Sequence, residues 1–236
     1  MFENAFTPEK LKEALDITLH EIPFALWETL YVTVIATALA TLIGLPLGVL
    51  LVAGEKNGVR PLPGWLMKTI NVIINLLRSV PFLILMIMVF PLTRLIVGTT
   101  VGTVASIVPL VIAAFPFVAR LAESSFREVD PNLIEAAQSM GASPTQIILK
   151  VMIPESIPSL ISNITIATTT ILGYTAMSGI IGGGGLGKIA INYGYYRYKY
   201  VVMTVAVILL IVLVQLFQTI GTKLAARSDK RIRTQK

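Results

Sequence analysis

The chain has no cysteine, a single histidine and few charged residues. Without cysteine it can form no disulfide and has no thiolate to act as a nucleophile or metal ligand. Only 14% of its 236 residues are charged and 55% are hydrophobic. A soluble domain carries roughly 25% charged and about 45–50% apolar residues. The composition therefore indicates an integral membrane protein, and it excludes disordered and collagen-like chains.

Long uncharged runs predict the membrane-spanning helices, because about 20 apolar residues are needed to cross the hydrocarbon layer. One candidate is interrupted by Arg78 and Pro81, and another is followed by a glycine-rich stretch that we expect to be non-helical. The expected spans are residues 29–54, 69–90, 95–119, 157–177 and 200–222. The sequence thus predicts an all-α membrane protein with five transmembrane helices and its two termini on opposite sides.

The distribution of positive charge predicts which terminus lies outside, since lysine and arginine resist translocation. On the N-terminal side of the membrane, the segments outside the spans carry Lys10, Lys12, Arg94, Lys188, Arg197 and Lys199. The opposite side carries Lys56, Arg60, Lys68, Arg120, Arg127, Lys150, Lys223, Arg227, Lys230, Arg231, Arg233 and Lys236. This excess predicts an external N-terminus and a cytoplasmic C-terminus.

Three regions follow from these spans. Residues 1–26 contain acidic residues and leucines at helical spacing, which favours an extracytoplasmic, interfacial amphipathic helix over a cleavable signal peptide. Residues 27–222 form the transmembrane domain. Residues 223–236 are a basic cytoplasmic tail that we expect to contact lipid phosphates rather than nucleic acid.

The glycine-rich stretch Gly182–Gly187 followed by Lys188 superficially matches two nucleotide-binding motifs. A P-loop needs a hydroxyl after its lysine to hold magnesium, and Ile189 has none. Both motifs also require a preceding strand, whereas this stretch follows a membrane helix. We interpret it as a flexible or tightly turning segment in which glycine permits positive φ and close approach of chains. Such a segment suits a constriction or gate.

The polar loop between the third and fourth spans, about residues 123–155, carries two sets of helix-capping signals. Asp130 can cap the N-terminus of a first helix that has a proline at its first position. Gly141 is placed to end this helix by adopting a left-handed conformation. Ser143 and Gln146 match a capping box for a second helix, which we expect to stop at Pro154. Capping alone indicates no more than an interfacial connector.

The residues of this loop resemble the EAA signature of the permease subunits of ABC importers. The matching pattern is Glu135-Ala136-Ala137, then Gly141, then the segment from Val151 to Pro154. In that family the elbow is a coupling helix that docks into a groove of a separate cytoplasmic ATPase. The resemblance implies that the alanines allow close packing, Glu135 is a polar anchor and Gly141 makes the turn. It predicts that Gly141→Asp abolishes transport while the permease stays in the membrane.

Further segments resemble the methionine-uptake permeases of this family. They are residues 78–82, 174–179, 182–187 and 193–195, and the likeness extends from about residue 30 to about residue 220. The resemblance implies a type I ABC importer permease fold in the bacterial plasma (inner) membrane. It also implies two copies of the chain, two ATPase subunits and an external methionine-binding lipoprotein. No catalytic residue, metal or cofactor is expected in the permease itself.

The fourth span carries a stripe of small and hydroxyl residues at helical spacing, which predicts a lining for a passage. Met177 follows on the same span and is a candidate for a soft, adaptable plug. The candidate pathway residues are Ser162, Thr165, Thr169, Gly173 and Met177. The alternative is that these residues only pack helices together, as small residues do in many membrane bundles.

Arg78 is the one charge within an expected span, and it shares a helical face with Asn71 and Asn75. One interpretation is a polar contact or pathway role inside the membrane for Asn75 and Arg78. The other is that the second span begins near Arg78, which then extends to the cytoplasmic surface.

Rival functions lack the residues they would need. A secondary transporter requires protonatable or ion-binding residues in its spans, and an intramembrane enzyme requires nucleophiles or acids there. Apart from Arg78, the expected spans hold no charged residue and no histidine. An ABC importer permease for another small polar solute remains open, because hydroxyls and one methionine suit many solutes.

Overall fold

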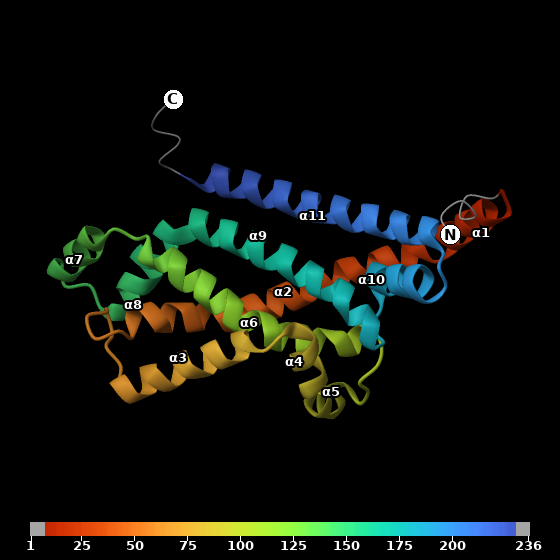
Figure 1. Cartoon of the computed structure of the whole chain (residues 1–236). Helices are drawn as coiled ribbons and strands as arrows, with labels where there is room; N and C mark the ends of the chain where they lie inside the picture. The colour runs from red at the N-terminus through yellow and green to blue at the C-terminus, as the bar shows by residue number, and fades with distance from the viewer. Residues whose placement is uncertain (1–7, 230–236) are drawn as a thin grey trace. The chain divides into compact units, whose positions relative to one another are not determined.

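The computed structural model describes residues 8–229, and every regular element in that range is helical (Figure 1). The first half contains α1 (Pro8–His20), α2 (Ile22–Ala53), α3 (Gly64–Ser79), α4 (Phe82–Met88), α5 (Phe90–Val97) and α6 (Thr103–Arg127). Next come α7 (Pro131–Ser139), α8 (Pro144–Ile147), the π-helical η2 (Ile148–Met152) and α9 (Ile153–Ser178). The remainder is the 3₁₀ turn η3 (Gly179–Ile181), α10 (Gly185–Ile189), the π-helical η4 (Ala190–Tyr196) and α11 (Tyr200–Ser228).

Within the described residues, four helices are long and apolar enough to cross a membrane, or up to five if α3 and α4 together form one broken span. The expected second span, residues 69–90, is not one continuous helix, because α3 begins at Gly64 and ends at Ser79, and Val80 next to Pro81 is extended. The four long helices are α2, α6, α11 and the stretch Pro144–Ile181, which contains α9. The all-helical architecture is as predicted.

The predicted third span, residues 95–119, has wrong boundaries. The helix in that region is α6, which begins at Thr103 and continues to Arg127. Residues 95–97 belong instead to α5, which ends at Gly98 with a φ of 83°. Gly98 and Gly102 both have positive φ, a conformation that glycine adopts without steric cost, so the chain turns here before α6 starts.

The chain folds as two compact units that draw on the same long helices. Unit 1 consists of the described parts of Met1–Thr37, Phe82–Val111 and Thr168–Phe217, and unit 2 of those of Ala38–Pro81, Ile112–Ala167 and Gln218–Lys236. The buried cluster of unit 1 joins α1, α2, α9, α10, η4 and α11 through Ala14, Ile22, Ala25, Leu172, Leu186, Ile189, Tyr193, Val202, Ala206 and Leu213. The larger cluster of unit 2 joins α6, α7, α8, η2 and α9 through Ala122, Phe126, Ala137, Ile147, Met152 and Leu160.

In unit 2, two glycines let α2 lie directly against α6. A Cβ at Gly44 would come within 2.8 Å of the Phe115 carbonyl oxygen, and one at Gly48 within 2.5 Å of Ala122 Cβ. Lipid tails are as apolar as leucine, so helices in a membrane associate through such close contacts of small residues. These two glycines therefore determine how closely α2 and α6 pack within unit 2.

Residues 8–20 of the N-terminal region form the helix α1, with Leu15 and Leu19 exposed and Ala14 buried in the cluster of unit 1. The interfacial position of this helix stays a prediction. His20 is exposed, and its ring lies 3.1 Å from the Asp16 carboxylate. Residues 1–7 of the predicted N-terminal region and residues 230–236 of the predicted basic tail lie outside the described part of the chain.

Candidate coupling loop and transport pathway

The first helix of the predicted elbow, α7, is capped as its sequence indicates. The Asp130 carboxylate accepts a hydrogen bond from the Asn132 N–H at 2.9 Å, and Pro131 occupies the first helical position. After Met140, Gly141 adopts a φ of 77°. Its left-handed conformation ends α7 and turns the chain toward α8 (Figure 1).

The second helix, α8, begins with the predicted capping box. The Ser143 hydroxyl accepts from the Gln146 N–H at 3.4 Å, and the Gln146 side chain accepts from the Ser143 N–H at 2.8 Å. The expectation that this helix stops at Pro154 is wrong, because the chain continues through η2 into α9. In the π-helical turn the Ile153 N–H donates to the Ile148 carbonyl, and this wider turn accommodates a proline that cannot donate a backbone hydrogen bond.

The three residues of the Glu135-Ala136-Ala137 motif have different environments. Glu135 and Ala136 are exposed on α7, whereas Ala137 is buried in the larger cluster of unit 2. Met140, which the sequence analysis did not single out, is 81% exposed at the end of α7. Glu135, Ala136 and Met140 are thus among the exposed residues of α7 and its C-terminal end, and Ala137 attaches the helix to its own unit.

Arg120 makes the main polar contacts between α3 and α6 in unit 2. Its guanidinium donates to Asn71 Oδ1 at 2.7 Å, to Asn75 Oδ1 at 3.0 Å and to Glu123 Oε2 at 2.7 Å. The spacing of the two asparagines at i and i+4 was visible in the sequence, but they were expected to share a helical face with Arg78 and no contact with Arg120 was predicted. An arginine so satisfied can lie within a long apolar helix without ending it.

Arg78 is exposed on α3, and within residues 8–229 it makes no ion pair. Arg127, at the end of α6, instead pairs with both Glu55 and Glu123. Together with Arg120, Arg127 fixes the C-terminal end of α6 to the segment after α2 and to α3. The elbow that follows α6 therefore starts from an anchored helix end.

The predicted pathway residues all lie on α9, with Ser162 and Thr165 in unit 2 and the other three in unit 1. Thr165 is buried, its hydroxyl donates to the Ile161 carbonyl, and it packs against Gly221 of α11, where a Cβ would overlap it. For Thr165 this contact favours the packing interpretation.

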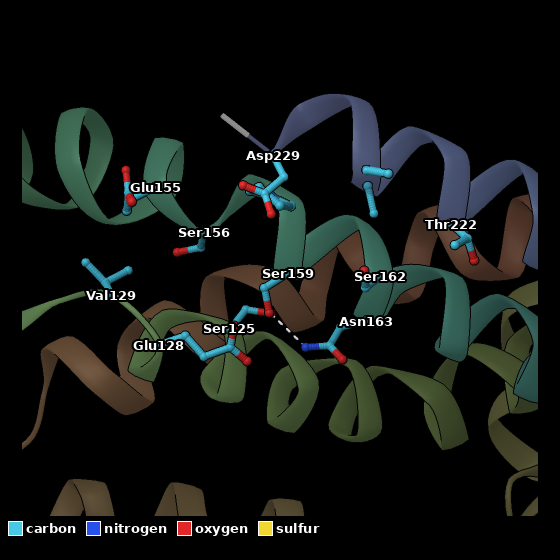
Figure 2. A pocket seen from close by; sticks show the side chains of 13 residues that line it. Ser125, Glu128, Val129, Glu155, Ser156, Ser159, Ser162, Asn163, Thr222 and Asp229 are labelled. Carbon is cyan, nitrogen blue, oxygen red and sulfur yellow. Dashed lines mark hydrogen bonds between the residues drawn. The ribbon is translucent and has the colours of Figure 1, made fainter. Parts of the chain in front are cut away.

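Ser162 lines a polar pocket of unit 2 with a volume of about 530 Å³ (Figure 2). Inside it the Asn163 amide donates to Ser125 Oγ at 2.8 Å, and Ser159 donates to the same oxygen at 3.1 Å. Carboxylates of Glu128, Glu155 and Asp229 also line the pocket. Ser159 and Asn163 have helical spacing that was visible in the sequence, but Ser125 comes from α6 and was missed.

In unit 1, Gly173 borders an apolar groove of about 370 Å³ between α9 and α11, and Met177 is 43% exposed near the end of α9. Thr169 lies on the same helix. The glycine segment that follows α9 is a tight turn, as predicted, with positive φ at Gly182 and Gly185. It is not wholly non-helical, however, because α10 begins at Gly185.

Aromatic and charged side chains of η4 and of the segment that follows it contact the N-terminal region within unit 1. The Tyr193 hydroxyl donates to Glu21, and Lys199 Nζ donates to Glu13 at 2.7 Å. The hydrogen bond to Glu21, followed by burial, raises the pKa of the Tyr193 hydroxyl. Tyr195 and Tyr198 are exposed beside this contact.

The chain is similar to known transport proteins over most of its length. The model of the family described as "Binding-protein-dependent transport system inner membrane component" matches residues 44–233. The "Probable D-methionine transport system permease protein MetI" of Vibrio cholerae is 51% identical over 208 residues, which cover 88% of this chain and 92% of that protein. The D-methionine transport system permease protein MetI of Escherichia coli K12 is 44% identical over 153 residues, covering 65% and 70% of the two chains.

A solved structure shares the fold. A chain of the inward-facing MetNI methionine ABC transporter superposes with a TM-score of 0.88 at 40% identity, covering 90% of this chain and 98% of that chain. The family model covers well over half of the sequence and includes the elbow described above. The chain belongs to the family of inner membrane components of binding-protein-dependent transport systems.

Proposed function

We propose that the chain is the permease subunit of an ATP-driven ABC importer that translocates methionine, in D- and L-forms or as derivatives. The observation that carries the coupling role is the elbow itself, in which two capped helices meet at Gly141 and expose Glu135, Ala136 and Met140. Support for methionine comes from the relatives, whose names specify D-methionine transport.

The proposed partners follow from the same resemblance. Two copies of the chain form the translocation unit, one ATPase docks on α7 of each copy, and an external lipoprotein delivers methionine. A rigid, capped helix suits docking because little conformational entropy is lost when it binds. The exposed Lys223 and Arg227 at the end of α11 suit contact with the anionic lipid of the inner leaflet.

The proposed pathway follows α9. Ser162 and the other serines of the unit 2 pocket offer hydroxyls that can form hydrogen bonds with a small polar solute. Thr169, Gly173 and Met177 lie further along the same helix. Thr165 packs against Gly221, so its contribution is to hold α9 and α11 together. The exposed, flexible Met177 side chain is the proposed plug.

Reconstitution tests this function. The chain is co-purified with its cognate ATPase and binding protein, and vesicles are assayed for uptake of methionine against glutamine and betaine. ATP-dependent uptake of methionine alone is the expected result. Uptake without ATP would support a secondary transporter, and preference for another solute would reassign the substrate.

A matched variant tests the coupling role. Gly141→Asp adds a negative charge at the turn that ends α7, the helix that carries the exposed Glu135. We expect the variant to enter the membrane normally and to lose ATP-dependent uptake. Unimpaired uptake by this variant would overturn the assignment of the elbow.

A further inference from the structure

A carboxylate at the start of α2 binds the glycine-rich segment of unit 1. Glu28 Oε2 accepts a hydrogen bond from the Gly185 N–H at 2.8 Å, and Glu28 Oε1 accepts one from the Thr103 hydroxyl of α6. The hydroxyl of the next residue, Thr29, accepts from the Leu186 N–H at 2.9 Å. Two adjacent side chains of α2 therefore satisfy the first two N–H groups of α10, which have no partner within their own helix.

The glycines leave the space that these side chains occupy. A Cβ at Gly184 would come within 2.6 Å of the Glu28 carboxylate, and one at Gly185 within 2.5 Å of Thr29 Oγ1. Gly185 also has a φ of 83°. A larger residue at either position would displace Glu28 or Thr29, so these glycines form a fixed contact rather than a flexible linker.

The same segment packs back onto the end of α9. The Gly183 N–H donates to the Ser178 carbonyl at 2.9 Å, and a Cβ at Gly187 would lie 2.7 Å from the carbonyl carbon of Ala176. Both contacts flank Met177. The position of this end of α9 thus depends on the glycine segment, which in turn is bound to Glu28.

We propose that Glu28 is a positioning residue for the proposed Met177 plug. With Thr103, it holds the glycine segment Gly182–Gly187 against α2 and α6 and so fixes the end of α9 that carries Met177. A carboxylate suits this position because its two oxygens accept from two donors at once. The charge-assisted hydrogen bonds offset the cost of its partial burial. The gating part of this proposal rests on the transport function proposed above.

Paired variants separate the hydrogen bonds from the charge. Glu28→Ala removes both acceptors, and Thr103→Val removes one donor while keeping the shape of the side chain. Glu28→Gln retains an acceptor for the Gly185 N–H and a donor toward Thr103, and Thr103→Ser retains the hydroxyl. Glu21→Gln is the control, because Glu21 is a nearby carboxylate of unit 1 that bonds Tyr193 rather than the glycine segment.

The first readout is passive leak of methionine from vesicles that contain the full transporter without ATP. We expect Glu28→Ala to raise the leak about tenfold, the factor that corresponds to roughly 1.4 kcal/mol and to about one hydrogen bond to a charged group. Thr103→Val should raise it less. We expect a leak near the wild-type rate in three variants, Glu28→Gln, Thr103→Ser and the Glu21→Gln control. If Glu28→Ala and Thr103→Val acted only through a general loss of folding, the conservative variants would not restore the wild-type rate.

The second readout does not depend on transport. Because the chain has no cysteine, Ile180→Cys introduces a unique thiol at a side chain that is 48% exposed beside the glycine segment. In the Glu28→Ala background, a membrane-impermeant maleimide should label this cysteine several-fold faster. Unchanged labelling in both Glu28→Ala and Thr103→Val would overturn the proposal. If wild-type vesicles fail to import methionine, the proposed function fails, and the labelling rate still decides whether Glu28 holds the segment.

Discussion

At the scale of single residues, the guanidinium of Arg120 connects two helices of unit 2 from within a helix long enough to span the membrane. Its side chain is 20% exposed and reaches two asparagine oxygens of α3 as well as Glu123. Removing a partly buried charge leaves its partners unsatisfied, which costs more than an exposed contact contributes. Arg78, which was expected on the same helical face as Asn71 and Asn75, is exposed and makes no ion pair within the described residues.

Arg120→Gln should therefore destabilise the permease by about 1–3 kcal/mol, because Asn71, Asn75 and Glu123 lose their shared donor. Arg78→Gln is the matched control and should change the stability by no more than about 0.5 kcal/mol, as expected for an exposed position. Thermal unfolding of the two variants in the same detergent measures the difference. Equal losses in both would contradict the role assigned to Arg120.

Met140 allows a second test at this scale, since an apolar side chain that is 81% exposed at the end of α7 suits burial against a partner. Met140→Ser should weaken binding of the ATPase by about tenfold, or roughly 1.4 kcal/mol. Met140→Leu keeps the apolar contact and should bind normally. The affinity of the purified ATPase for the permease in nanodiscs is the measurement, and equal binding by the serine variant would remove Met140 from the docking surface.

At the scale of elements, the α7–α8 elbow is defined by local chemistry at three points. Asp130 starts α7, Gly141 ends it, and the Ser143 capping box starts α8. Each contact is made within a few residues along the chain, which is why the sequence predicted all three. The continuation through η2 was not predicted, because a proline such as Pro154 usually ends a helix and only the π-helical turn before it allows the helix to go on.

Substitutions at Gly141 can separate the effect of its backbone conformation from the effect of side-chain contacts. Its φ is 77°, and nothing lies within 4 Å of a Cβ placed there, so the backbone conformation alone limits which residue fits. Gly141→Asn should retain ATP-dependent uptake, since asparagine tolerates the left-handed region. Gly141→Val should lose most of it, because a β-branched residue is strained there by about 1–2 kcal/mol or more. Equal uptake by both variants would show that the turn does not control coupling.

At the scale of the whole molecule, the proposed orientation rests on the excess of lysine and arginine in the segments that include the elbow and the tail. An external N-terminus and a cytoplasmic C-terminus would place α7 where an ATPase can reach it. The same orientation would place α1 and the exposed tyrosines of η4 where an external binding protein approaches.

Single-cysteine labelling tests this orientation, because the natural chain has no cysteine to interfere. Lys12→Cys on α1 and Ser139→Cys on α7 are both at exposed positions. In intact cells, an impermeant maleimide should label residue 12 directly and residue 139 only after permeabilisation. The reverse pattern would invert the topology and would place the elbow away from any cytoplasmic ATPase.

Features that depend on composition and on neighbours along one helix could be predicted from the amino-acid sequence. Scarce charge and long apolar runs predicted a helical membrane protein, and the caps at Asp130, Gly141 and Ser143 predicted the elbow. Helix periodicity and capping act over about four residues, so a single sequence displays them.

The pairing of polar groups that are distant along the chain became visible in the folded molecule. Asn71 and Arg120 are 49 residues apart in the sequence, and Glu28 and Gly185 are 157 apart. Such pairs form because close packing of glycine-bearing helices brings distant segments together, and no local pattern specifies a partner at that separation. Arg78, for which the sequence left a buried and a surface position open, is exposed on α3. The glycine segment, interpreted as flexible or tightly turning, is bound by the Glu28 carboxylate. Both outcomes depend on contacts with distant segments that no local pattern displays.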